Sequence, residues 1–219
     1  MTPAPLAFLH TSPVHIATFD RLVRARAPGL SVAHHVDPAL LSDAQTLGAD
    51  SPRIVERVEA AMRQAAAAGA RVVVCTCSTL GGAAERTPLG AGRHAARIDR
   101  AMADSAVLQG PRVLVVAALE STLHPTAALI EDSAAHLQRR VTLDFLAVPP
   151  AWALFQRGEH AAYLESIVAA LRADARPVDV VVLAQASMAA AAEALMPYRV
   201  PILSSPSLGV ERVLALLRR

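Results

Sequence analysis

Two cysteines, Cys75 and Cys77, end an apolar run in the stretch "RVVVCTCSTLGGAAE" (residues 71–85). Ser78, Thr79 and a pair of glycines follow, which is typical of a turn that leads into a helix. The free N–H groups of a helix start bind a carboxylate or phosphate, and they lower a thiol pKa from about 8.5. Cys77 is therefore the candidate proton carrier or nucleophile, and Ser78 and Thr79 are the candidate hydroxyl donors to a substrate carboxylate.

Three other interpretations of the cysteines compete with catalysis. Cys75 lies inside the apolar run, where a structural role is expected, and Cys77 is also small enough to be only a buried side chain at a strand end. A reversible Cys75–Cys77 disulfide, as in a redox module, would be strained between neighbours two apart on one strand. A C-x-C pair supplies two metal ligands and no nearby cluster completes a zinc set, so no metal site is expected.

A repeat links this stretch to a second part of the chain. With a shift of 108 residues, "VVVCTCSTLGGAAE" (72–85) aligns with "VVVLAQASMAAAAE" (180–193), and six of the fourteen positions are identical. The same shift aligns "FLHTSPVHIATF" (8–19) with "VAALESTLHPTA" (116–127). We therefore expect two related halves, with Gln185 at the position of Cys77, Ser187 at that of Thr79, and Glu120 at that of Ser12.

Short Val/Leu/Ile runs alternate with Ala-rich stretches, which predicts an α/β fold of parallel strands with right-handed crossovers. The predicted strands are 5–10, 31–36, 71–76, 112–118, 141–148, 178–184 and 200–204. The predicted helices are 14–26, 52–68, 81–87, 98–108, 124–138, 160–173, 187–196 and 206–218.

Ligands of α/β sheets bind outside the carboxyl ends of the strands, so we expect a cleft between the halves. The predicted cleft is lined by 10–12, 77–79, 120–122 and 185–187. His10, Thr11 and Ser12 are candidate substrate-binding residues, and Glu120 is a candidate acid or base. The alternative for both groups is an ordinary solvated loop or a helix cap, and for Ser187 it is a helix N-cap.

The composition excludes several classes of protein. The 219 residues are 53% hydrophobic and 3% aromatic, with 21 basic against 19 acidic residues. There is no long basic run, so nucleic acid is not an expected partner. The most apolar tract, 180–196, is interrupted by polar residues, so a membrane span is not expected. With no secretory signal and two closely spaced cysteines, a cytoplasmic protein is expected.

Segments along nearly the whole chain resemble the aspartate/glutamate racemase superfamily, which also contains hydantoin racemases, maleate cis–trans isomerases and arylmalonate decarboxylases. The segments are "LHTSP" (9–13), "HHVDPALL" (34–41), "CTCSTLG" (75–81), "RIDRAMADSAV" (97–107), "VVLAQASMA" (181–189) and "VPILSSPSLGVERVL" (200–214). The resemblance implies two pseudo-symmetric Rossmann-like lobes, residues 1–98 plus 205–219 and residues 99–204. It also implies that no cofactor is used, that Asp37 lies in a substrate loop, and that a homodimer forms. Asp37-Pro38 is also ordinary turn chemistry.

The resemblance assigns the first catalytic cysteine to Cys77, but Gln185 stands where the second is expected. A glutamine amide neither takes nor returns a proton at neutral pH, so two-thiol racemisation is not expected. Gln185 instead orients the substrate or donates to a developing enolate. We expect an isomerase or lyase that acts beside a carboxylate of a small amino or organic acid. Decarboxylation, cis–trans isomerisation and one-thiol racemisation all stay open, the last with Glu120 or His10 as second base. The alternative is a non-catalytic protein that binds a small dicarboxylate.

Overall fold

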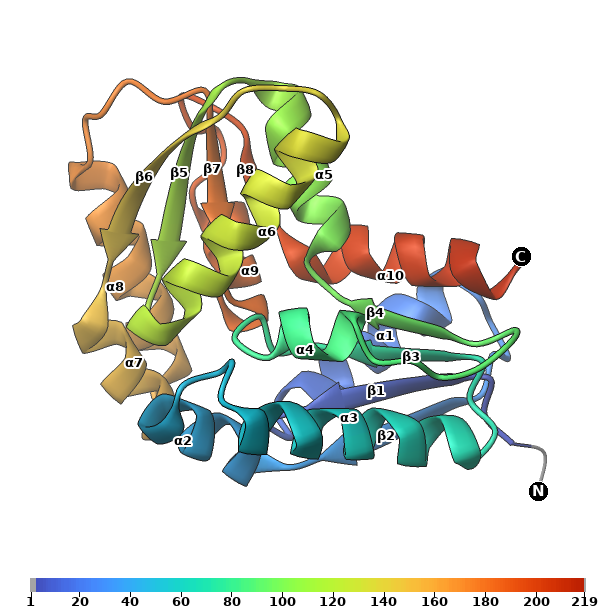
Figure 1. The fold of residues 1–219 in the computed structure, drawn as a ribbon. Helices are drawn as coiled ribbons and strands as arrows, with labels where there is room; N and C mark the ends of the chain where they lie inside the picture. Colours follow the sequence, from blue (N-terminus) through green and yellow to red (C-terminus); the bar gives the residue numbers. More distant parts are fainter. Residues whose placement is uncertain (1–2, 219) are drawn as a thin grey trace. The chain divides into compact units, whose positions relative to one another are not determined.

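The computed structural model describes residues 3–218, which divide into two compact units. Unit 1 runs to Arg100 and resumes at Pro206, and unit 2 is Ala101–Ser205. Each unit holds a four-stranded parallel sheet with helices on both faces (Figure 1). The predicted α/β fold with two related parallel lobes is confirmed.

Unit 1 has the strand order β2-β1-β3-β4. Its elements are β1 (Leu6–His10), α1 (His15–Arg26), β2 (Val32–Val36), α2 (Pro38–Leu47), α3 (Pro52–Ala67), β3 (Val72–Cys75), α4 (Gly81–Glu85), β4 (His94–Arg97) and α10 (Ser205–Leu217).

Side chains alternate between the two faces of the unit 1 sheet, because successive strand residues point to opposite sides. Leu9 and Cys75 pack with α2 and α3, in a cluster that includes Leu40 and Met62. Phe8 faces the other way, against Phe19 of α1, with 5.0 Å between the ring centroids. Both faces are therefore buried, which explains why β1 and β3 read as continuous apolar runs.

Unit 2 has the strand order β6-β5-β7-β8, the same order as unit 1. Its elements are α5 (Arg100–Gln109), β5 (Arg112–Ala117), η1 (Glu120–Thr122), α6 (Leu123–His136), β6 (Thr142–Ala147), α7 (Pro149–Gln156), α8 (His160–Ala173), β7 (Val180–Leu183), η2 (Ala186–Met188), α9 (Ala189–Ala194) and β8 (Ile202–Ser204). Helices α7 and α8 cover one face of its sheet, and α5 and α6 lie along the other (Figure 1).

The pairing of the strands shows which residues of the two units are equivalent, and it corrects part of the sequence repeat. Strands β3 and β7 keep the 108-residue shift, but Leu9 pairs with Cys75 whereas Val116 pairs with Leu183, so β1 and β5 differ by 107. By this register Gln185 still corresponds to Cys77. Glu120, however, corresponds to Pro13 rather than to Ser12, so that part of the sequence alignment is off by one residue.

Four elements were not predicted from the sequence, one of them the three-residue helix η1. The strand β4, "HAAR", is short and half alanine, so it lacks the β-branched run that marks strands such as β3 and β7. Helices α2 and α7 each begin at a proline that lies within two residues of a strand end. They were missed because only one helix was expected between two successive strands.

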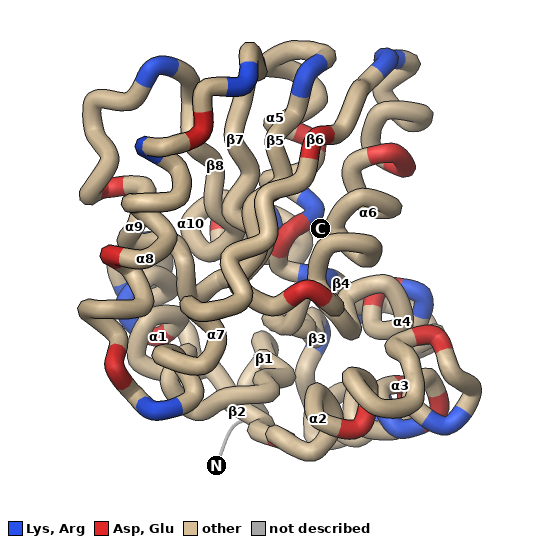
Figure 2. Tube along the Cα trace, turned by 90° about the vertical axis from the view of Figure 1, so that its left-hand side faces the viewer, with Lys and Arg blue, Asp and Glu red and all other residues tan. Residues whose placement is uncertain are grey.

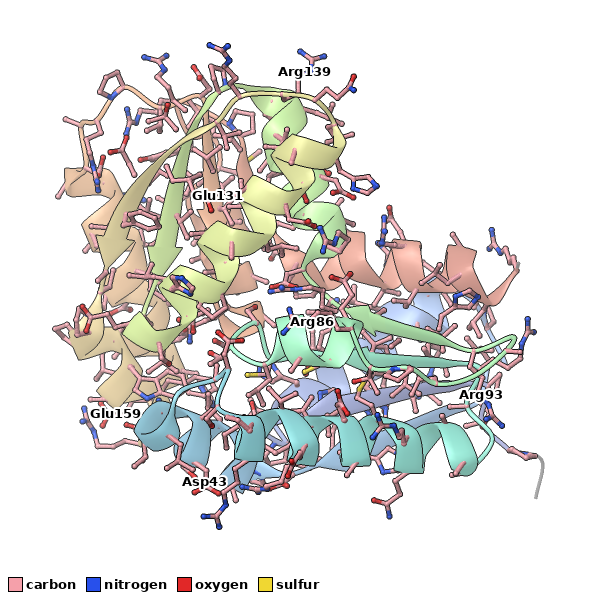
Figure 3. The ribbon with its side chains drawn as sticks, in the orientation of Figure 1. Asp43, Arg86, Arg93, Glu131, Arg139 and Glu159 are labelled. Atoms are coloured by element: carbon pink, nitrogen blue, oxygen red, sulfur yellow. The ribbon has the colours of Figure 1, made fainter. Side chains whose placement is uncertain are left out.

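The charged residues lie mainly on helices and loops, and the strands carry few of them (Figure 2). Arg86, Arg93, Glu131, Arg139 and Glu159 are exposed examples (Figure 3). Within residues 3–218, Arg97 and Asp99 are the only buried residues among the arginines, aspartates and glutamates. In that same range no helix is long and apolar enough to cross a bilayer.

Gly209 of α10 lies against the residue after β4. A Cβ atom there would stand 2.1 Å from the carbonyl oxygen of Ile98. Helix propensity alone predicts that Gly209→Ala stabilises the fold by about 1 kcal/mol. We expect the opposite sign, a loss of about 1–3 kcal/mol, because the carbonyl belongs to the backbone and yields little. Urea denaturation measures this change in the free energy of unfolding. The substitution Ala215→Gly, at an exposed position of α10, measures the contribution of helix propensity alone. An unchanged or higher stability would contradict this packing.

Candidate active site

Cys77 occupies the turn between β3 and α4. The parallel pairing of β1 with β3, closed by the Thr76 N–H donating to the Leu9 carbonyl (3.0 Å), brings the residues after β1 beside this turn. Hydrogen bonds from the Thr11 and Thr79 hydroxyl groups and from the backbone N–H groups of Thr79 and Leu80 favour the thiolate form of Cys77. The Leu80 N–H is shared, since it also donates to the Cys77 carbonyl oxygen at 3.2 Å. The structure thus brings together Thr11, Cys77 and Thr79.

Burial raises the pKa of the Cys77 thiol, and the four hydrogen-bond donors lower it without reversing that effect. A lowered thiol pKa was predicted from the helix start that follows Cys77, and this prediction was wrong. Helix α4 is only five residues long, so its dipole contributes little. At neutral pH the group is therefore a thiol whose thiolate form has ready hydrogen-bond partners.

Cys75 makes no contact that fits a redox pair. It is 1% exposed, and its thiol donates to the Cys77 carbonyl oxygen at 3.5 Å rather than facing the Cys77 sulfur. Burial also raises the pKa of Cys75, and both cysteines are free thiols. This geometry fits the structural role expected for Cys75.

Ser78 offers an unsatisfied hydroxyl in the same turn. The residue is 5% exposed, and its Oγ has no hydrogen-bond partner among residues 3–218. A buried hydroxyl without a partner costs free energy. A bound carboxylate oxygen is one group that could relieve this cost.

An ion pair that the sequence analysis missed lies under the turn. Arg97 donates to both carboxylate oxygens of Asp99 (2.7 and 3.0 Å) and to the Ser78 carbonyl oxygen (3.3 Å). The sequence places the two residues two apart, but only the fold shows that both side chains turn inward.

His10 is fully buried, and both ring nitrogens are already bonded. Nδ1 lies 2.9 Å from the Thr76 hydroxyl and Nε2 lies 2.8 Å from His34 Nδ1. His34 Nε2 in turn lies 3.1 Å from an Asp20 oxygen. In this structure His10 supports the end of β1 and presents no nitrogen to a ligand.

Asp37 and Ser12 lie near the same sheet edge but are engaged locally. An Asp37 oxygen accepts from the Ala39 N–H at 3.0 Å and so caps α2, and its other oxygen faces Arg57 at 3.5 Å. Ser12 is partly exposed, and its carbonyl oxygen accepts from the His15 N–H.

In unit 2, Gln185 is tied to the backbone. Its side-chain oxygen accepts from the N–H groups of Ala118 and Leu119, at 2.7 and 2.9 Å. Since two N–H donors converge on this atom, it must be the oxygen, and the NH₂ group is the part that can donate to a ligand. The expected departure from acid–base chemistry at this position therefore comes with a defined structural role.

The two other candidates of unit 2 differ in their surroundings. The Ser187 hydroxyl is hydrogen-bonded to the Tyr163 hydroxyl at 2.7 Å, and burial raises the pKa of Tyr163 to about 12. Glu120 is exposed in η1. Tyr163 was missed because it lies in α8, 24 residues from Ser187, in a stretch that reads as an ordinary amphipathic helix.

No group of three or more His, Cys, Asp or Glu residues within 3–218 is arranged to hold a metal ion.

The model of the Asp/Glu/Hydantoin racemase family matches residues 10–213, so the chain belongs to that family. This membership supports an enzyme of the racemase superfamily, with an isomerase- or lyase-type activity on small acids. A search of the curated proteins gave no significant match.

Solved structures of similar fold include two racemases and a decarboxylase. Glutamate racemase from Bacillus anthracis has a TM-score of 0.71 at 15% identity, over 98% of this chain and 82% of that chain. Allantoin racemase from Klebsiella pneumoniae has a TM-score of 0.62 at 20% identity, over 97% and 87%. A cysteine-substituted arylmalonate decarboxylase has a TM-score of 0.60 at 18% identity, over 97% and 93%. At these identities the likeness shows the fold.

Two substitutions of Gln185 distinguish the role of its side-chain oxygen, the acceptor, from that of its NH₂ group, the donor. Gln185→Ala leaves two backbone N–H groups without their acceptor, and we expect it to lower the free energy of unfolding by about 1–3 kcal/mol. Gln185→Glu keeps the acceptor and removes the donor, so at neutral pH its stability should stay within about 1 kcal/mol of the wild type. Chemical denaturation compares them. Equal losses in both variants would argue against the tie to Ala118 and Leu119.

Burial, with smaller contributions from His34, His15 and His35, lowers the pKa of His10 to about 3. Below pH 6.5, His10 is protonated in the unfolded chain but stays neutral in the folded protein. The free energy of unfolding therefore falls as the pH falls, by up to about 1.4 kcal/mol per pH unit. His10→Asn removes this titration. Between pH 7 and pH 5 we expect the wild type to lose about 2 kcal/mol more than the variant in urea denaturation. Parallel curves would contradict it.

Proposed function

We propose that the protein is a cofactor-independent isomerase or lyase that acts at a carbon next to a carboxylate of a small organic or amino acid, with Cys77 as the proton carrier. The observation that supports this most strongly is that Cys77, in the turn after β3, is surrounded by four hydrogen-bond donors and followed by the unpartnered Ser78 hydroxyl. Family membership supports the class of reaction.

The proposed step is proton delivery. A carbanion or enolate formed next to the substrate carboxylate takes the proton from the Cys77 S–H, and the electron pair of the S–H bond stays on sulfur. The thiolate that results is stabilised by the Thr11 and Thr79 hydroxyl groups and by the N–H groups of Thr79 and Leu80. Reprotonation of the thiolate by water, or the reverse transfer, completes the cycle.

The presence of Gln185 in place of a second thiol limits the reactions that are compatible with the site. Its oxygen is engaged by the backbone, so its role is to donate from NH₂ to a substrate oxygen. Decarboxylation requires one proton after CO₂ leaves, and one thiol suffices for it. The similarity of fold to an arylmalonate decarboxylase is consistent with this reaction. Cis–trans isomerisation also fits one thiol, with sulfur as nucleophile. Racemisation requires a further base, for which exposed Glu120 is a better candidate than His10.

The carboxylate is proposed to bind to hydroxyl groups. The unpartnered Ser78 Oγ is the candidate of the Cys77 turn, since the Thr79 hydroxyl already donates its hydrogen to the Cys77 sulfur, and the Ser187 hydroxyl, bonded to Tyr163, is the candidate of unit 2. His10, Ser12 and Asp37 are engaged in local structure, and we propose for them a supporting role rather than direct contact with substrate.

The alternative function is a non-catalytic protein that binds a small dicarboxylate on the same fold. It is favoured by one observation, that Gln185 stands where a second thiol would be required for two-base chemistry.

The test follows proton exchange and product formation by NMR in D₂O with a panel of amino acids, substituted malonates, succinates and maleate. We expect exchange or conversion with one class of substrate, and a loss of at least about 100-fold in Cys77→Ser, the contribution typical of a positioned acid or base. Cys75→Ser is the matched control, since Cys75 lies two residues away with its thiol turned to the backbone, and it should retain turnover.

Turnover that survives in Cys77→Ser would reject the proposed mechanism. Saturable binding of a dicarboxylate without any turnover across the panel would favour the alternative function.

A further inference from the structure

One peptide group links the buried Arg97 to the Cys77 sulfur. Arg97 Nη2 donates to the Ser78 carbonyl oxygen at 3.3 Å, and the Thr79 N–H donates to the Cys77 sulfur. The Ser78 C=O and the Thr79 N–H are the two ends of the same planar peptide. In a trans peptide they point in opposite directions. A hydrogen bond that holds the carbonyl toward Arg97 therefore directs the N–H toward Cys77.

Arg97 is itself held rigidly. It is 4% exposed, and its guanidinium group donates through Nε and Nη2 to the two oxygens of Asp99, which is 0% exposed. The guanidinium lies on the Cα of Gly81, where an added Cβ would stand 2.7 Å from Nε and 2.8 Å from the central carbon. The planar fork of arginine fits this arrangement, and lysine has no equivalent of it.

A buried ion pair is a costly way to hold a turn, since both charges lose their hydration. An apolar pair could fill the same space but could not bond the Ser78 carbonyl. The pair lies directly behind the peptide that faces Cys77. This position is explained by the hydrogen bond to the Ser78 carbonyl oxygen and not by packing alone.

We propose that Arg97, clamped by Asp99 and seated on Gly81, is a positioning residue that locks and polarises the Ser78–Thr79 peptide so that its N–H stays aimed at the Cys77 sulfur. The series Asp99 carboxylate, Arg97 guanidinium, Ser78 carbonyl and Thr79 N–H is a chain of hydrogen bonds in which each strengthens the next. When sulfur gains negative charge, this donor is already oriented. The inference rests on the proposed function of Cys77 as proton carrier.

The first test measures the Cys77 thiol without any substrate. The rate of alkylation by iodoacetamide is followed against pH, and mass spectrometry of fragment ions distinguishes Cys77 from Cys75. In Arg97→Lys we expect the pKa of Cys77 to rise by roughly 0.5–1 unit, because one weakened hydrogen bond raises the free energy of the thiolate. Gly81→Ala, which pushes the guanidinium away from the other side, should shift it in the same direction.

Arg112→Lys is the matched control. Arg112 also forms a two-point pair with an aspartate, Asp179, but this pair lies in unit 2 and takes no part in the Cys77 turn. Its replacement should leave the Cys77 titration unchanged. A Cys77 pKa that is the same in wild type, Arg97→Lys and Gly81→Ala would overturn the proposal.

A second measurement needs no variant and applies if the Arg97 variants do not fold. Hydrogen exchange of the Thr79 amide in the wild type, followed by NMR, should be slowed at least tenfold relative to the rate expected for an unstructured chain, because the N–H is bonded to sulfur. Exchange at the unprotected rate would overturn the proposal.

Both readouts are independent of turnover. If no substrate reacts but the Cys77 pKa responds to Arg97→Lys, the proposed function fails and the positioning role stands. If Cys77→Ser abolishes turnover while Arg97→Lys changes neither the thiol pKa nor kcat, the positioning role fails and the proposed function stands. With both correct, Arg97→Lys lowers kcat and leaves KM nearly unchanged.

Discussion

The parallel pairing of β1 with β3 is the constraint on which the candidate site of unit 1 depends. It sets Leu9 beside Cys75 and brings both strand ends to one edge of the sheet. Thr11 thereby reaches the Cys77 sulfur across 66 residues of sequence. A slip of one residue would turn Cys75 and Cys77 to the opposite face, away from the cluster with α3.

The two units link the ends of their first and third strands by different hydrogen bonds. In each, the residue two positions after the third strand of the unit bonds to the residues that follow the first. In unit 1 a Thr11 hydroxyl donates to Cys77, and in unit 2 the backbone N–H groups of Ala118 and Leu119 donate to Gln185. A glutamine oxygen accepts two backbone donors well and thereby keeps the turn without a thiol. The repeat thus preserves the geometry of the strand ends while the chemistry differs between the units.

The apolar runs and their repeat were sufficient to predict the α/β fold and seven of the eight strands. The signal is clearest in β3, β5 and β7, which are buried on both faces and rich in Val and Leu. The strand β4 escaped because alanine carries no such signal. The repeat also identified Cys77 and Gln185 as equivalent positions. What the sequence did not reveal is which side chains turn inward. Arg97, Asp99 and Tyr163 belong to types that are usually exposed or merely packed, and only the fold shows their partners. His10 illustrates the reverse error, since a polar residue at a strand end turned out to be fully buried.

The balance of forces on Cys77 bears on the kind of step it can perform. Burial disfavours its thiolate form, and the hydrogen-bond donors favour it. The site has both, and burial prevails, so the sulfur holds a proton until a stronger base comes close. A carbanion beside a carboxylate is such a base. In the proposed transfer, the four donors would limit the cost of forming the thiolate. Nucleophilic addition would require the thiolate before the substrate reacts, and burial disfavours that state. The same thiol is therefore better suited to give a proton to a reactive carbon than to attack one.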